Sequence, residues 1–187
     1  MLKIIAVAAT AILLPSAALA EDWGKFYAEV YGGATLGTDT TYNGSDYGMD
    51  PTWAAGAAFG IDMGNGFSLG LDVMKTGEAQ YQTDPATLST FSVMAEGEYA
   101  LALNDTFSVY GSLGLGAINV AIDTGGSDDA WGAGYSAAVG ARANITDNMA
   151  LFGELKHQDT FDTVELFGSD DVSAPTNTAL VGLRLSF

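Results

Sequence analysis

The fold class follows from the stretch Phe67-Ser-Leu-Gly-Leu-Asp-Val-Met-Lys75. Its alternate positions hold bulky apolar side chains on one side and small or mostly polar ones on the other: Phe67, Leu69, Leu71 and Val73 against Ser68, Gly70, Asp72 and Met74. A period of two residues is typical of a β-strand whose two faces meet different surroundings. The stretch therefore predicts a strand between an apolar environment and a more polar one.

The same alternation recurs from Lys25 to the end of the chain. Eight such runs lie at about 25–35, 52–61, 67–76, 89–102, 107–118, 130–143, 149–158 and 177–187. Short connections rich in Asn, Asp and Gly, which have the composition of hairpin turns, lie at Asp62–Gly66, Leu103–Thr106 and Asn144–Asn148. Long polar connections lie at about 36–51, 77–88, 119–129 and 159–176. This spacing predicts antiparallel hairpins with all the long loops at one end.

The bulky face is predicted to point outward, into lipid. Small side chains fit the narrow interior of an eight-stranded barrel, whereas bulky apolar ones fit a lipid-facing surface. The charged residues in phase with the small face are expected to form an interior polar network: Glu29, Asp72, Glu96, Glu98, Arg142, Glu154, Lys156 and Arg184. Large apolar residues near the ends of the runs predict two girdles: Phe26, Phe59, Phe67, Tyr99, Phe107, Met149 and Phe187 at the short turns, and Trp53, Phe91 and Trp131 at the long loops. Lys75 and His157 are placed outward at the long-loop rim.

A sheet in hydrocarbon must close on itself, because every backbone N–H and C=O needs an internal partner and closure removes exposed edges. The predicted fold is therefore all-β: an eight-stranded antiparallel up-and-down transmembrane β-barrel. Enclosed charges must pair, so Arg142 and Arg184 are expected to contact Glu154 or Glu29. The inward glycines are expected to leave space for trapped water without a continuous channel.

The first twenty residues predict an export signal. Lys3 gives a basic start, an apolar run follows from Ile4 to Leu14, and Ala18-Leu-Ala20 is a small-x-small cleavage site. The run is too short to span a bilayer, although an uncleaved N-terminal anchor is the alternative. The expected organisation is a signal peptide over 1–20 and one barrel domain over 21–187, with no room for a periplasmic domain.

Composition and charge exclude several functions. The 187 residues carry a formal net charge of −17 and contain no Cys, which excludes a disulfide scaffold, a thiolate metal site and a Cys nucleophile. The negative charge also opposes nucleic-acid binding. The Gly-rich segment Gly111–Gly116 lacks the Lys and the helix of a phosphate-binding loop. No catalytic residue, cofactor or defined metal site is predicted.

The long loops are acidic and contain no Lys or Arg. The segment Asp123-Thr-Gly-Gly-Ser-Asp-Asp129 offers oxygen ligands but lacks the regular spacing of an EF-hand. Divalent cations are therefore expected to bind these loops loosely, as a possible partner at the cell surface.

The chain resembles the eight-stranded outer-membrane barrels related to the OmpA transmembrane domain and the opacity-type surface antigens. The resemblance rests on Lys25-Phe-Tyr-Ala-Glu-Val-Tyr-Gly-Gly33, Phe91-Ser-Val-Met-Ala-Glu-Gly-Glu-Tyr99 and Val181-Gly-Leu-Arg-Leu-Ser-Phe187. It implies a porin-like surface protein in the outer membrane of a Gram-negative bacterium, in contact with lipid and lipopolysaccharide. It also implies a structural or surface-interaction role, and a C-terminal strand ending in Phe187 that the barrel-assembly machinery reads. The peptidoglycan-binding domain of the OmpA arrangement is missing, which argues against tethering to the cell wall.

Two alternatives stay open. Some barrels of this size resemble lipid A deacylases, which use a Ser with a His and an acidic partner. The single His, His157, is followed two residues later by Asp159 rather than Ser, while Ser169 and Ser173 lie in the last long loop. A lipid A-modifying hydrolase is therefore the enzymatic alternative. The second is a soluble lipocalin-like binder of small ligands, which requires the apolar face to point inward.

Overall fold

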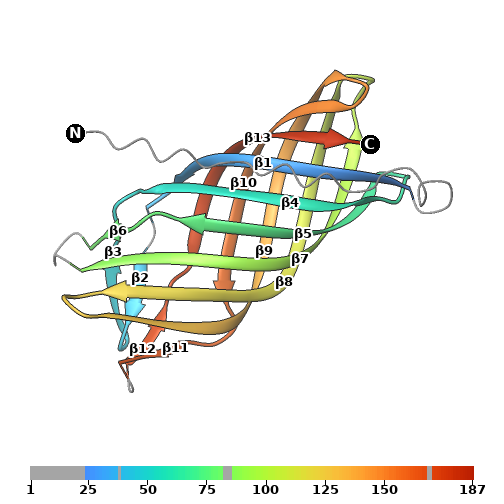
Figure 1. The fold of residues 1–187 in the computed structure, drawn as a ribbon. Helices are drawn as coiled ribbons and strands as arrows, with labels where there is room; N and C mark the ends of the chain where they lie inside the picture. The colour runs from blue at the N-terminus through green and yellow to red at the C-terminus, as the bar shows by residue number, and fades with distance from the viewer. Residues whose placement is uncertain (1–23, 38, 82–85, 168–169) are drawn as a thin grey trace.

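Eight long antiparallel strands form a closed ring in the computed structural model, which describes residues 24–37, 39–81, 86–167 and 170–187 (Figure 1). The strands are β1 (Lys25–Thr35), β4 (Trp53–Asp62), β5 (Phe67–Thr76), β7 (Thr87–Ala102), β8 (Phe107–Asp123), β9 (Ser127–Thr146), β10 (Met149–Thr160) and β13 (Thr176–Ser186). Each strand pairs with its neighbour along the chain, β5 pairs with β7, and β1 pairs with β13. The predicted all-β, eight-stranded, antiparallel barrel is confirmed.

The barrel closes where the first strand meets the last. β1 and β13 pair from Tyr27 opposite Ser186 to Thr35 opposite Thr178. The turn between β4 and β5 shows why the short connections fold tightly: Gly64, Asn65 and Gly66 all have positive φ angles, and the Asp62 carboxylate accepts the Gly64 N–H at 2.9 Å. These local turns and the β1–β13 pairing together fix the register of the sheet.

The two faces of the sheet differ as predicted. Leu71 is 58% exposed on the outside, whereas the next residue, Asp72, is 2% exposed on the inside. Apolar side chains also lie outward along the other strands, with examples in Val139, Leu155 and Val181. This outward apolar surface is what a barrel needs in hydrocarbon.

Girdle residues are found at both ends of the ring. Trp53 and Trp131 are exposed near the long loops, and Phe107 is exposed at a short turn. Phe26 stacks on the neighbouring Phe59 with ring centroids 5.9 Å apart. Lys75 is exposed at the long-loop end of β5, as expected.

The long connections contain more β-structure than predicted. The expected loop 119–129 is mostly strand, because β8 runs to Asp123 and β9 begins at Ser127. The other expected loops contain β2 (Asp39–Tyr42), β3 (Ser45–Gly48), β6 (Ala79–Gln80), β11 (Val164–Leu166) and β12 (Asp170–Ser173). These segments were not predicted because they are too short for a period of two to stand out.

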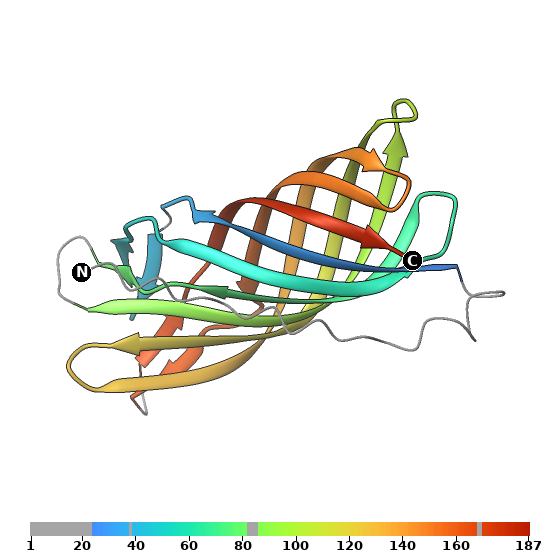
Figure 2. The same ribbon diagram turned by 45° about the horizontal axis from the view of Figure 1, so that its top comes forward.

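Four of these short strands form a second sheet in the order β11-β12-β2-β3, here called the cap sheet. It joins the first and last long loops, because β2 pairs with β12. Figures 1 and 2 show it at the end of the ring opposite the C-terminus. A barrel with short periplasmic turns and long outer loops places this end outside the cell.

Apolar residues fill the interior beneath the cap sheet, which corrects the expectation of an interior lined by small and charged side chains. This outer core contains Met49, Ala79, Tyr81, Ala86, Leu88, Met94, Ile118, Val120, Ile122, Val164, Leu166, Val172 and Ala174. Long loops that fold back over the barrel give these inward side chains something apolar to pack against. Burial raises the pKa of Tyr81 to about 12, so its hydroxyl stays protonated at neutral pH.

The predicted signal peptide, with its cleavage residues Ala18 and Ala20, lies outside the described residues and stays a prediction. Within the described part of the chain, no helix is long and apolar enough to cross a membrane.

Replacing Leu71 with Arg tests the face assignment. The charge would lie in hydrocarbon near mid-strand, so we expect a loss of about 2–4 kcal/mol of folding free energy. The measurement is denaturant unfolding of protein refolded into lipid vesicles. Leu36→Arg, at an exposed position after β1, is the matched control and should change little. Equal stability of Leu71→Arg and the native chain would reverse the assignment.

Candidate functional site

Eight charged side chains meet inside the barrel on the short-turn side of the outer core. They come from six strands: Glu29 on β1, Asp72 on β5, Glu96 and Glu98 on β7, Arg142 on β9, Glu154 and Lys156 on β10, and Arg184 on β13. Each points inward because it has the parity of the enclosed face. None of these side chains is more than 15% exposed. The contacts divide them into two groups.

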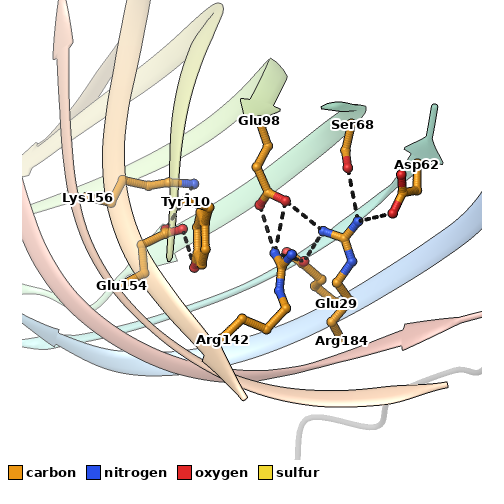
Figure 3. Close-up of polar contacts among 9 residues, drawn as sticks. All are labelled: Glu29, Asp62, Ser68, Glu98, Tyr110, Arg142, Glu154, Lys156 and Arg184. Carbon is orange, nitrogen blue, oxygen red and sulfur yellow. Dashed lines mark hydrogen bonds and ion pairs between the residues drawn. The ribbon is translucent and has the colours of Figure 1, made fainter. Parts of the chain in front are cut away.

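The arginine group consists of Arg142, Arg184, Glu29 and Glu98 (Figure 3). Arg142 donates to both oxygens of Glu98, at 3.0 and 2.8 Å, and lies 3.6 Å from Glu29. Arg184 donates to Glu29 at 3.0 Å and to Glu98 at 3.2 Å. Two positive and two negative charges therefore compensate each other through charge-assisted hydrogen bonds.

Further contacts hold the two guanidinium groups in place. Arg184 also donates to the Ser68 hydroxyl at 3.2 Å and lies over the Tyr27 ring, 3.6 Å from its centroid. Arg142 lies 4.7 Å from the centroid of the Tyr110 ring. A cation over an aromatic face is stabilised by the ring quadrupole, more so when it is shielded from water.

The lysine group consists of Lys156, Asp72, Glu96 and Glu154. The Lys156 Nζ atom lies 3.1 Å from Asp72, 2.9 Å from Glu96 and 3.8 Å from Glu154. Each carboxylate also accepts a hydrogen bond from one hydroxyl group, at 2.5, 2.8 and 3.0 Å: Tyr31 to Asp72, Ser136 to Glu96 and Tyr110 to Glu154. One positive charge is thus shared among three negative ones.

The pairing differs in part from the expected one. Both arginines contact Glu29, one of the two expected partners. The other, Glu154, instead meets Lys156 and Tyr110 among the described side chains. Glu98 was expected to point inward, but no partner was predicted for it. In the structure it is the carboxylate that contacts both arginines. The alternation of side chains predicts whether each residue points inward or outward. Which inward residues meet also depends on their positions along the barrel axis, and the tilt of the strands sets these positions.

Aromatic rings occupy much of the space above the inward glycines, which were expected to leave space for trapped water. Tyr27, Tyr31, Tyr110 and Phe152 are buried inside the barrel. A Cβ atom on Gly140 would lie 2.4 Å from the Tyr110 ring, and similar close approaches pair Gly56 with Tyr31, Gly60 and Gly70 with Tyr27, and Gly182 with Phe152. The glycines therefore allow large rings to fit into a narrow barrel.

A small cavity of about 20 Å³ remains between the charged groups and the rings. Its lining includes Asp72, Glu96, Ser112, Glu154 and Lys156. A volume of this size holds about one water-sized particle.

Among the described residues, the side chain of His157 bonds to Asn177 and Tyr135, and neither is a serine or an acidic residue. Its Nδ1 atom lies 2.8 Å from the Asn177 side-chain oxygen, and its Nε2 atom lies 3.4 Å from the Tyr135 hydroxyl. Ser173 belongs to β12 of the cap sheet rather than to an open loop. Ser169 lies outside the described residues.

The acidic outer segment uses its carboxylates for local hydrogen bonds. Asp123 accepts the Gly125 N–H at 2.9 Å, Asp128 accepts the Phe167 N–H at 2.5 Å, and Asp129 accepts from the Asn119 amide at 2.8 Å. Among the described residues, no group of three or more His, Asp or Glu side chains is arranged to hold a metal ion. Gly111–Gly116 lies within β8, which is the expected strand and not a phosphate-binding loop.

A closed sheet with an apolar outer surface and charges enclosed within it defines a transmembrane β-barrel. Residues 4–187 match the model of the outer membrane protein beta-barrel domain, and the chain belongs to this family. The protein is therefore located in the outer membrane. The outward apolar face and this location exclude the soluble lipocalin alternative.

Solved structures with this fold include several bacterial outer-membrane proteins. The barrel is similar to Neisserial surface protein A, with a TM-score of 0.67 and 14% identity over 87% of this chain and 97% of that one. It is similar to OprG of Pseudomonas aeruginosa, with a TM-score of 0.59 and 12% identity over 88% and 97% of the two chains. It is also similar to the protease OmpT of Escherichia coli, with a TM-score of 0.52 and 10% identity over 92% and 100%. These likenesses show the fold alone, and comparison of the sequence with curated proteins finds no match.

Replacing Gly140 with Ala tests the glycine–ring packing. The new methyl group would meet the Tyr110 ring and the Gly153 carbonyl oxygen, so we expect a loss of about 1–3 kcal/mol of stability. Gly126→Ala is the control, since a Cβ atom there meets nothing within 4 Å. Denaturant unfolding in vesicles measures both variants. A Gly140→Ala barrel as stable as Gly126→Ala would contradict the packing argument.

Proposed function

We propose that the protein is a non-enzymatic structural barrel that holds a rigid acidic surface outside the cell, with a plugged interior instead of a transport path. The interior packing is the observation that carries this proposal. The cavity between the charged groups and the rings has a volume of about 20 Å³, and the outer core fills the interior toward the long loops. Eight strands enclose little more than their own side chains, which favours a plug over a conduit.

The charged part of the plug supports a structural role because its members bridge distant strands. Glu98 on β7 is bonded to Arg142 on β9 and to Arg184 on β13. Lys156 on β10 reaches Asp72 on β5 across the interior. Such contacts hold the cross-section of the ring from within, in addition to the backbone bonds around it.

The outer end supports a surface-interaction role. The cap sheet and the β8–β9 hairpin present carboxylates to the outside, with exposed examples at Asp46, Asp123, Glu165 and Asp171. Pairing of β2 with β12 gives the carboxylates of the cap sheet a fixed arrangement. We propose that this surface contacts lipopolysaccharide through loosely held divalent cations, because anionic lipid and acidic loops repel each other unless cations lie between them.

The enzymatic alternative has less support. A lipid A hydrolase requires a nucleophile beside His157, and the side-chain partners of His157 among the described residues are Asn177 and Tyr135. The fold of a protease such as OmpT does not transfer its activity, because one barrel fold carries many functions.

The C-terminal residue supports a proposal about assembly. Phe187 is 52% exposed, and its backbone exchanges hydrogen bonds with Phe26 at 3.2 and 2.9 Å. An outward aromatic at the end of the closing strand can be recognised before the barrel closes. We infer that Phe187 is part of the signal for the barrel-assembly machinery.

Replacing Arg184 with Met tests the structural role of the charged interior. The single change leaves buried carboxylates without one of their cations, and we expect a loss of about 3–5 kcal/mol. The double change Arg184→Met with Glu29→Gln leaves Arg142 paired with Glu98 and should be less destabilising by about 1 kcal/mol or more.

Asp62→Asn is the matched control for this pair. Asp62 lies 3.9 Å from Arg184 but is 43% exposed, so its substitution should cost little. All variants are compared by denaturant unfolding in vesicles at one pH. A double variant no more stable than the single one would refute the role given to charge pairing.

Deleting Phe187 tests the assembly signal. We expect less protein in the membrane and more degradation in the periplasm, because the assembly machinery no longer recognises the last strand. The fraction of folded barrel is read from its shift in SDS gel mobility before and after boiling. Phe187→Tyr, which keeps an aromatic ring, is the control. Normal membrane levels of the deletion would refute this role for Phe187.

A further inference from the structure

The lysine group carries more negative charge than its cation compensates. Asp72, Glu96 and Glu154 supply three negative charges and Lys156 supplies one positive charge, which leaves a formal charge of −2. The arginine group is balanced, with two charges of each sign. Carboxylates enclosed in a barrel are poorly solvated, so an uncompensated excess is unfavourable. A further positive charge beside the lysine group would therefore stabilise the fold.

A place for such a charge exists next to the lysine group. The cavity of about 20 Å³ is lined by all three of its carboxylate residues and by Ser112 on β8. Ser112 is only 6% exposed, and its hydroxyl oxygen has no hydrogen-bond partner among the described residues. A hydroxyl group has lone pairs that can bind a cation. An unpartnered buried hydroxyl beside an excess of carboxylates indicates a bound cation, which oxygen atoms can coordinate.

We propose that this cavity binds one small monovalent cation of the Na⁺ type through the Ser112 hydroxyl and carboxylate oxygens of the lysine group. Hard cations prefer oxygen ligands of this kind. A divalent ion is disfavoured because the Lys156 ammonium group already lies among the three carboxylates and compensates one of their charges. The site goes beyond the structural role proposed above, which a plug without a bound ion would also fulfil.

Salt-dependent stability of the complete barrel tests the proposal. Protein purified in detergent is unfolded with urea in NaCl or in choline chloride at the same ionic strength, so that general screening is equal. Choline is too large for a cavity of about 20 Å³. We expect Na⁺ at about ten times its Kd to raise the ratio of folded to unfolded protein about tenfold, as one-site linkage requires.

Two serine variants locate the effect. Ser112→Ala removes the unpartnered hydroxyl and should abolish most of the difference between the two salts. Ser92→Ala is the matched control, because Ser92 is also buried but is bonded to Gln158, and it should keep the difference. Equilibrium dialysis with radioactive ²²Na⁺ should give about one ion per folded barrel, and a loss of binding in Ser112→Ala.

Several results would overturn the proposal. Identical unfolding of the native chain in NaCl and choline chloride would mean that protons, not Na⁺, compensate the lysine group. Full retention of the Na⁺ effect in Ser112→Ala would place the ion elsewhere. If Ser112→Ala does not fold, the two-salt comparison and the dialysis on the native chain decide the question.

Discussion

In hydrocarbon, each backbone N–H and C=O must find a partner within the chain, and this constraint governs the whole structure. It requires β1 to pair with β13, so that no strand keeps an open edge. A ring of only eight strands is narrow, and every inward side chain must fit among those from the opposite wall. The charge pairs, the ring-to-glycine contacts and the outer core are all consequences of that narrow closed interior.

The interior meets this requirement in two different ways along its length. Toward the short turns, charged side chains compensate one another across the ring. Tyr31 and Tyr110 donate hydroxyl hydrogen bonds to them, and the ring faces of Tyr27 and Tyr110 lie against the two arginines. Toward the long loops, the interior is apolar and is closed by the cap sheet. The described strands of the outer loops are therefore part of the folded body, because the cap sheet pairs them with one another.

Much of this architecture was predictable from local patterns. The alternation at Phe67–Lys75 predicts a strand, and it predicts which of its side chains face lipid and which face the interior. This works because successive side chains of a pleated strand point to opposite faces of the sheet. Hairpin turns such as Asp62–Gly66 depend on residues that tolerate positive φ angles, which are also visible in the sequence. Parity also brought all eight charged residues to the interior side of the sheet.

The remaining features depend on distances that no local pattern contains. Glu98 contacts both Arg142 and Arg184 because the tilt and stagger of the strands bring the three side chains to the same level of the barrel. The inward direction of Tyr27 and Tyr31 is visible from parity, but their fit depends on glycines in other strands, such as Gly60 and Gly56. The cap sheet joins Tyr42 to Val172 across most of the chain, through strands too short to show a period.

Single-channel recording in planar bilayers tests the central claim, a barrel whose interior is a plug, most directly. Folded protein is incorporated into a bilayer in 1 M salt, and insertion is verified by its resistance to SDS before boiling. The packing of the charged groups, the rings and the outer core predicts a flat baseline without steady conductance steps. Uniform steps in the nanosiemens range would show an open path through the barrel and contradict the account.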